Sequence, residues 1–82
     1  MEDSKEKFTG ALTDADPTSK MQFYELFNNA LELFHLSAHD VTRRFNVSVH
    51  SVDKWKNHKN APHPLMRQTV YEWFRELIST ER

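Results

Sequence analysis

The sequence predicts an all-α protein, a compact four- to five-helix bundle with a central helix-turn-helix. Two observations support this fold class. Apolar residues in the stretch 36–57 recur at intervals that fit two short helices joined by a tight turn, whereas one continuous helix would break their register. The flanking stretches 21–34 and 64–79 each carry an apolar face with helical periodicity.

Length and composition limit the remaining possibilities. A chain of 82 residues forms one domain and buries only about 60% of its unfolded surface, so we expect a small core rich in aromatic side chains. The chain contains no cysteine, which excludes a disulfide framework and a thiolate metal site. No apolar run approaches the ~18 residues of a membrane span, and the polar start resembles no signal peptide. We therefore expect a cytoplasmic protein without a membrane partner.

Positive charge is concentrated in one part of a chain whose net charge is -1. Residues 1–19 hold five acidic and two basic side chains, a net charge of -3. Residues 37–67 hold six basic and two acidic side chains, a net charge of +4, and four histidines besides. A local basic segment in a nearly neutral chain is typical of a phosphate-binding surface.

The chain divides into a flexible N-terminal arm, residues 1–16, and a helical domain, residues 17–82. The arm holds the only glycine and shows no sustained periodicity. The first helix is expected to begin near Asp16-Pro17, with Thr18 as the competing cap. Its apolar stripe belongs to the core and consists of Phe23, Phe27, Ala30, Leu31 and Phe34.

Serine caps delimit the two central helices. Ser37 caps a helix over 38–45, and the Asp40 carboxylate lies in its first turn, where the helix dipole favours negative charge. Asn46 suits the left-handed conformation that ends such a helix. Ser48 then caps a helix over about 49–58, whose buried side is Val52 and Trp55.

The face opposite Val52 and Trp55 is polar and comprises Ser48, His50, Asp53, Lys54 and Asn57. A surface helix with a purely structural role would contain strong helix formers, and most of these residues are mediocre ones. The composition indicates a surface that recognises a binding partner.

Two prolines end this helix, and Lys56, Lys59 and Asn60 cluster near its end, within reach of a phosphate backbone. A last helix is expected from Pro64 to about Ser79. Its apolar side is assigned Leu65, Val70, Trp73, Phe74, Leu77 and Ile78, with Arg67 on the polar side. The apolar side is wide, so Tyr71, Trp73 and Phe74 form a candidate dimer surface.

The stretch from Ser37 to Pro64 resembles the helix-turn-helix of the Cro/C1-type (phage repressor-like) DNA-binding proteins. The pattern that carries the resemblance is LSAHDVTRRFNVSVHSVDKWKNHKNAP. The chain has Thr42 where that family usually has a small residue and Asn46 where it usually has glycine. The typical glycine shortly after the tryptophan is also missing, and His58 stands nearest.

The resemblance implies a homodimer that binds a palindromic operator in double-stranded DNA, with the helix 49–58 in the major groove. The base-reading positions carried over are Ser48, Val49, His50, Asp53, Lys54 and Asn57. The resemblance also implies that Ser37, Ala38 and His39 present the N-terminus of the helix 38–45 to a phosphate. Such a protein would be a transcriptional regulator of phage, plasmid or bacterial type, associated with the nucleoid when bound to DNA.

The candidate base-reading side chains suit different bases. Asn57 matches adenine, Lys54 matches guanine or a phosphate, His50 matches a guanine edge, and Val49 matches a thymine methyl group. Asp53 repels phosphates unless it accepts from a cytosine amine, and a merely solvated role is equally open. For Arg43 and Arg44, on the outer side of the helix 38–45, phosphate contact and an ordinary solvated face are also equally open.

Other function classes receive less support. His35 and His39 have a zinc-binding spacing, but Ser37 breaks the helix between them and no third ligand is evident, so we expect no metal. No nucleophile-base set, carboxylate pair or glycine-rich loop indicates an enzyme, a cofactor or a small-molecule substrate. A protein-interaction adaptor or anti-repressor with the same fold is the main alternative, and an architectural recombination factor is another.

Overall fold

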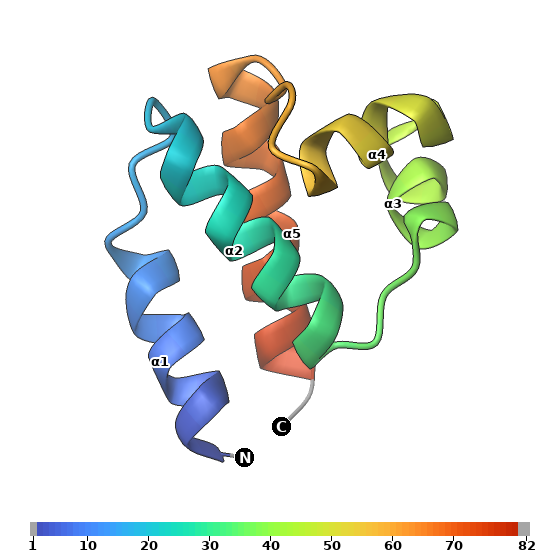
Figure 1. Ribbon diagram of the computed structural model, residues 1–82. Helices are drawn as coiled ribbons and strands as arrows, with labels where there is room; N and C mark the ends of the chain where they lie inside the picture. The colour runs from blue at the N-terminus through green and yellow to red at the C-terminus, as the bar shows by residue number, and fades with distance from the viewer. Residues whose placement is uncertain (1, 81–82) are drawn as a thin grey trace.

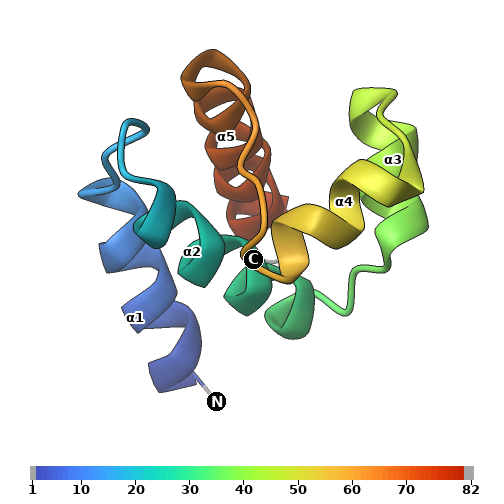
Figure 2. The same ribbon diagram turned by 45° about the horizontal axis from the view of Figure 1, so that its top comes forward.

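Five α-helices make up the part of the chain, residues 2–80, that the computed structural model describes; side chains are described for residues 6–80. The helices are α1 (Glu2–Thr13), α2 (Lys20–Leu33), α3 (Ala38–Phe45), α4 (Val49–Lys56) and α5 (Pro64–Thr80). The long helices α2 and α5 lie between α1 on one side and the pair α3 and α4 on the other (Figures 1 and 2). The predicted all-α bundle with a central helix-turn-helix is therefore confirmed.

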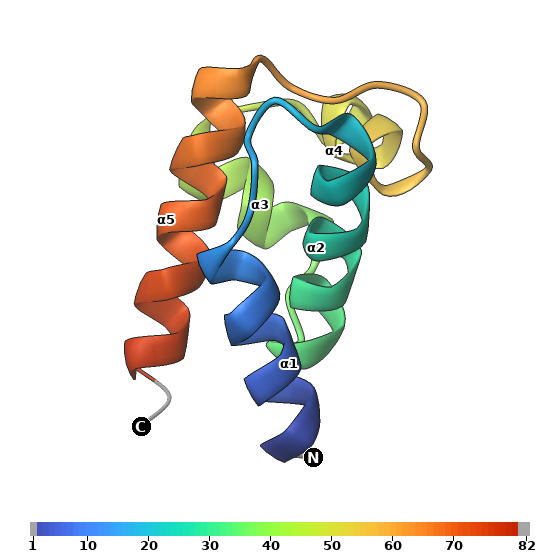
Figure 3. The same ribbon diagram turned by 90° about the vertical axis from the view of Figure 1, so that its left-hand side faces the viewer.

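Residues 2–13 form α1, where the sequence predicted a flexible arm over residues 1–16. This expectation is wrong for the backbone of the described residues. Phe8 and Leu12, one helical turn apart, are buried, and the ring of Phe8 contacts those of Phe34 and Phe74. Figure 3 shows α1 packed across α2 and α5. Over residues 6–13 the buried side chains are Phe8 and Leu12 alone, and tertiary packing outweighs this weak local pattern.

Helix α2 begins at Lys20, three residues later than expected. Ser19 is its N-cap, and the Ser19 hydroxyl accepts a hydrogen bond from the N–H of Gln22. Asp16 instead closes a local turn, in which its carboxylate accepts from the N–H and the hydroxyl of Thr18. These two hydrogen bonds lower the pKa of the Asp16 carboxyl. The predicted stripe of α2 is buried at Phe23, Phe27, Ala30 and Leu31, and Phe34 is partly buried.

Histidines occupy the left-handed positions that end two helices. After α2, His35 has φ 56°, and after α4, His58 has φ 59°. At the end of α4 the N–H of His58 donates to the Trp55 carbonyl, and the N–H of Lys59 donates to the Lys54 carbonyl. This is the Schellman pattern, in which the left-handed residue is usually glycine. In this chain, whose only glycine is Gly10, histidine occupies both positions.

Helix α5 presents most of its predicted apolar side to the core, since Val70 and Phe74 are buried and Trp73, Leu77 and Ile78 pack against the buried cluster, but two assignments are wrong. Arg67, assigned to the polar side, is 4% exposed, and Leu65, assigned to the apolar side, is 69% exposed. The guanidinium of Arg67 donates to the carbonyls of Pro62 and Pro17, so it connects the two loops that flank α2 and α5. Buried charge is tolerated there because backbone oxygens satisfy it. None of the helices over residues 2–80 combines the length and apolar character required to span a membrane.

Candidate nucleic-acid interface

Helices α3 and α4 form the predicted motif, with local contacts that match the sequence. The Ser37 hydroxyl accepts from the Asp40 N–H, and the Asp40 carboxylate accepts from the Ser37 N–H at 2.8 Å, which completes a capping box. Asn46 ends α3 in the left-handed conformation, with φ 57° and ψ 44°. Ser48 caps α4 by accepting from the Ser51 N–H. Both serine caps and the asparagine are therefore confirmed.

Two buried side chains anchor α4 on the rest of the bundle. Val52 is fully buried and Trp55 is 4% exposed. The indole of Trp55 meets the rings of Phe23 and Phe27 edge to face, with centroids 6.0 and 5.6 Å apart. Aromatic contacts of this geometry stabilise by about 0.5–1.5 kcal/mol each beyond burial. The orientation of α4 is thus fixed from its inner side.

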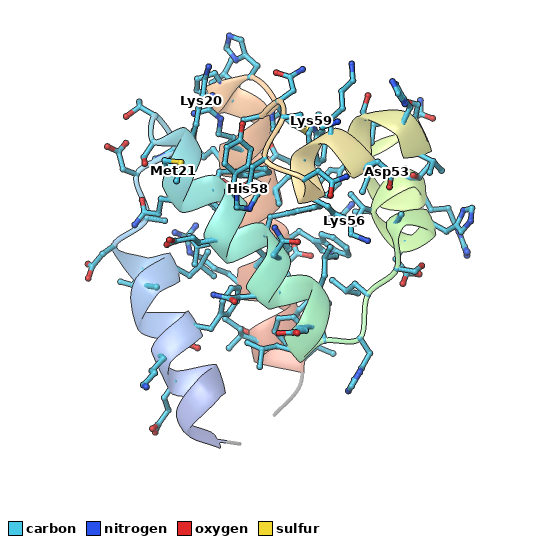
Figure 4. The ribbon with its side chains drawn as sticks, in the orientation of Figure 1. Lys20, Met21, Asp53, Lys56, His58 and Lys59 are labelled. Carbon is cyan, nitrogen blue, oxygen red and sulfur yellow. The ribbon has the colours of Figure 1, made fainter. Side chains whose placement is uncertain are left out.

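The opposite face of α4 points to solvent. His50, Asp53 and Asn57 follow one another at spacings of three and four, which places them on one side of the helix, and all three are exposed. Val49 is 38% exposed, and Lys54 is partly buried at the flank. Figure 4 shows Asp53 on this outer surface. The six predicted base-reading positions therefore remain accessible to a partner.

Two of these side chains also have local structural tasks. The Ser48 hydroxyl donates to the Ser51 hydroxyl at 3.0 Å in addition to capping α4. The side-chain amide of Asn57 donates to the Asp53 carbonyl at 2.9 Å, which closes the last turn of the helix. Asn57 keeps its second N–H and its Oδ1 for another partner, because an amide offers two donors and one acceptor. Within residues 6–80 the Asp53 carboxylate forms no ion pair.

The predicted phosphate-contacting residues lie in three places. Ser37, Ala38 and His39 are at the start of α3, where the Asp40 carboxylate already accepts from the Ser37 N–H. That hydrogen bond and the one from the Ser37 hydroxyl lower the pKa of the Asp40 carboxyl. At the other end of the motif, the exposed residues Lys56, Lys59 and Asn60 surround the C-terminus of α4.

Arg43 and Arg44 lie in a third place, beside α5. Both line an open groove of about 490 Å³ between the end of α2, α3 and α5, together with Phe34, Leu36 and Trp73. Arg44 forms an ion pair with Glu76 of α5 at 3.6 Å. Helix α4 also packs against α3, in which Thr42 is partly buried with its Oγ1 shielded from solvent. The two arginines therefore do not join the cluster of lysines at the end of α4.

The predicted dimer surface is mostly inside the protein. Tyr71 is 1% exposed and Phe74 is fully buried, in contact with Phe23 and Phe27 respectively. Trp73 is partly buried and meets the ring of Phe45 edge to face, with centroids 5.2 Å apart. The apolar side of α5 is wide because it packs against α1 as well as against α2 and α3. Tyr71 and Phe74 offer no surface to a second copy.

The sequence interpretation missed how the end of α4 attaches to α2. The imidazole of His58 stacks on the ring of Tyr24, with centroids 4.7 Å apart and planes 8° apart. Asn28 donates its side-chain N–H to the Lys56 carbonyl. The only signal in the sequence was His58 itself, which stands near the usual position of a glycine.

The described residues offer no other site chemistry that we can identify. Over residues 6–80, no three histidine, aspartate or glutamate side chains gather closely enough to hold a metal ion. Comparison of the chain with protein-family models, with curated proteins and with solved structures gave no match.

Proposed function

We propose that this protein binds double-stranded DNA sequence-specifically through its helix-turn-helix, with α4 in the major groove, and that it acts as a transcriptional regulator. The observation that carries the proposal is the outer face of α4. His50, Asp53 and Asn57 project from a helix whose inner side is fixed by Val52 and Trp55. Polar side chains on a rigid helix are the means by which base edges are read.

The surroundings of α4 support the same proposal. Lys56, Lys59 and Asn60 lie at its C-terminal end, and the N-terminus of α3 is the other end of the motif. In the major groove a recognition helix has a phosphate backbone on each side, so contacts are needed at both ends of the motif. We leave Arg43 and Arg44 out of the proposed phosphate contacts because they line the groove beside α5.

A binding titration tests the proposal. Fluorescently labelled duplex fragments of the encoding genome, including the region upstream of the gene itself, are titrated with the protein at 150 mM salt. We expect at least one fragment to bind about 10³-fold more tightly than generic duplex DNA, as specific binders do. Binding that never exceeds the generic duplex, even at low salt, would contradict sequence-specific recognition.

A protein-interaction adaptor is the second candidate, and the groove lined by Trp73, Phe34 and Arg43 is the observation that favours it. The two candidates differ in which residues a ligand perturbs. In an NMR titration with duplex DNA, chemical-shift changes confined to residues 37–60 support DNA binding. The absence of changes there would support the adaptor.

A further inference from the structure

Three exposed lysines surround the junction between the end of α4 and α2. Lys56 is the last residue of α4, Lys59 follows in the loop, and Lys20 is the first residue of α2. Figure 4 shows Lys59 above and Lys56 below, both on the α4 side of His58, and Lys20 at the start of α2. Within residues 6–80 none of the three forms an ion pair. The junction therefore carries uncompensated positive charge.

The junction is held by contacts between side chains and backbone. His58 keeps the left-handed conformation that ends α4, and its ring stacks on Tyr24 of α2. Asn28, one turn further along α2, donates to the Lys56 carbonyl at 3.2 Å. Lys20 lies one turn before Tyr24, on the same side of α2. The backbone at Lys56 and Lys59 is thus fixed relative to that at Lys20.

A non-glycine residue in the left-handed conformation is strained. The stack of His58 on Tyr24 offsets this strain, because stacked aromatic rings attract each other beyond the effect of burial. The acidic side chains nearest in sequence are Asp16, before α2, and Glu25 and Asp53 on the two helices; all three are exposed, and none pairs with a lysine of residues 6–80. A ligand for this junction therefore needs several negative charges spaced along its length.

We propose that Lys20, Lys56 and Lys59 bind phosphates along one strand of duplex DNA, so that the DNA-contacting surface extends from α4 onto α2. This inference rests on the proposed function, because it requires α4 to lie in the groove. The major groove is about 12 Å wide, so a helix within it has one backbone near each of its ends. The N-terminus of α3 faces one backbone, and the lysine junction faces the other.

Lys20 is the critical residue because it lies outside the helix-turn-helix. The test compares Lys20→Gln with Lys7→Gln, a matched loss of one positive charge from an exposed position on α1. Both proteins and the wild type are titrated against a labelled 20-bp duplex of generic sequence between 50 and 200 mM salt. Circular dichroism confirms that each variant keeps its helical content.

We expect Lys20→Gln to reduce the slope of log affinity against log salt by about one unit, since each phosphate contact contributes about 0.9. Its affinity should fall about three- to tenfold at 100 mM salt for every duplex, whereas Lys7→Gln should match the wild type. Equal slopes for the two variants, with a wild type that binds, would overturn the inference and leave the proposed function intact. A wild type that binds no duplex would overturn both.

Discussion

Asn28 of α2 donates its side-chain N–H to the carbonyl of Lys56, the last residue of α4, across 28 positions of sequence. The same amide group donates to the Tyr24 carbonyl within α2. With the stack of His58 on Tyr24, this hydrogen bond attaches the end of the proposed recognition helix to the core. The outer face of α4 is therefore presented by a helix held along its inner side and at its C-terminal end.

Replacing Asn28 tests this attachment. Asn28→Ala removes both hydrogen bonds, so the free energy of unfolding should fall by about 1–2 kcal/mol, since each such bond contributes about 0.5–1.5 kcal/mol. Asn29→Ala, at the exposed neighbouring position, should change it by less than about 0.5 kcal/mol. Urea unfolding followed by circular dichroism measures both. Equal effects of the two substitutions would show that the Asn28–Lys56 bond does not stabilise the fold.

Substitution of a base-reading residue should reduce DNA affinity in a sequence-dependent way, whereas substitution of a phosphate-binding residue should reduce it for every sequence. His50→Ala or Asn57→Ala should cost about 1–3 kcal/mol on one preferred site and little on others. Lys59→Ala should weaken binding to all sequences alike and reduce the salt slope by about one unit. Fluorescence titrations against the preferred site and a scrambled duplex separate the two patterns. If His50→Ala and Lys59→Ala behaved identically, the base-reading assignment would be wrong.

Substitution of Gly10 tests whether residues 2–13 form a helix or a flexible arm. A Cβ added to Gly10 would meet nothing within 4 Å, and the residue lies inside α1. Gly10→Ala should therefore raise the free energy of unfolding by about 0.5–1 kcal/mol, because alanine loses less backbone entropy in a helix. Ala11→Gly, at the exposed next position, should lower it by a similar amount. In a flexible arm neither substitution would change thermal unfolding.

The Tyr71 hydroxyl is buried without a hydrogen-bond partner among the described residues, and Tyr71 is only 1% exposed. Tyr71→Phe should stabilise the protein by about 1 kcal/mol at pH 7, because it removes an unsatisfied buried polar group and keeps the ring. Burial raises the pKa of Tyr71 to about 12. The ordinary pKa of a tyrosine is 10. The wild type should therefore lose stability as the pH rises from 10 towards 12, and Tyr71→Phe should lose less. Urea unfolding at pH 7 and pH 11 checks both expectations.

Asp40 should make the stability of the fold depend on pH in the acidic range. The Ser37 N–H and hydroxyl lower the pKa of the Asp40 carboxyl below its ordinary 3.8. Because the pKa is lower in the folded state, the carboxylate stabilises the fold above pH 3.8, and this contribution is lost as the pH falls through the folded value. Wild type should thus be more stable than Asp40→Asn at pH 6, with the difference closing below pH 3.8. A difference that does not change with pH would rule out the capping role.

Three of the four helical boundaries of the motif were predictable because they depend on residues within one turn, whereas the helix expected over about 49–58 ends at Lys56, before the left-handed His58. Ser37, Ser48 and Asn46 act on neighbouring backbone groups, so their roles follow from residue type and spacing. The start of α2 was not predictable from the sequence, because Asp16, Thr18 and Ser19 are all residue types that can cap a helix. The choice of Ser19 became clear only from the hydrogen bonds that all three make.

By itself the sequence determined an all-α fold, the central helix-turn-helix, and a polar face on α4 that Val52 and Trp55 hold outward. Only the tertiary structure decided which surfaces remain free. Packing of α1 buries Phe8 and Leu12, and Tyr71 and Phe74 lie in the core and not at an interface. Arg43 and Arg44 lie beside α5, whereas Lys20 lies on the side of α2 that meets His58. The reason is physical: a local pattern specifies which face of a helix is apolar, but long-range contacts decide what covers it.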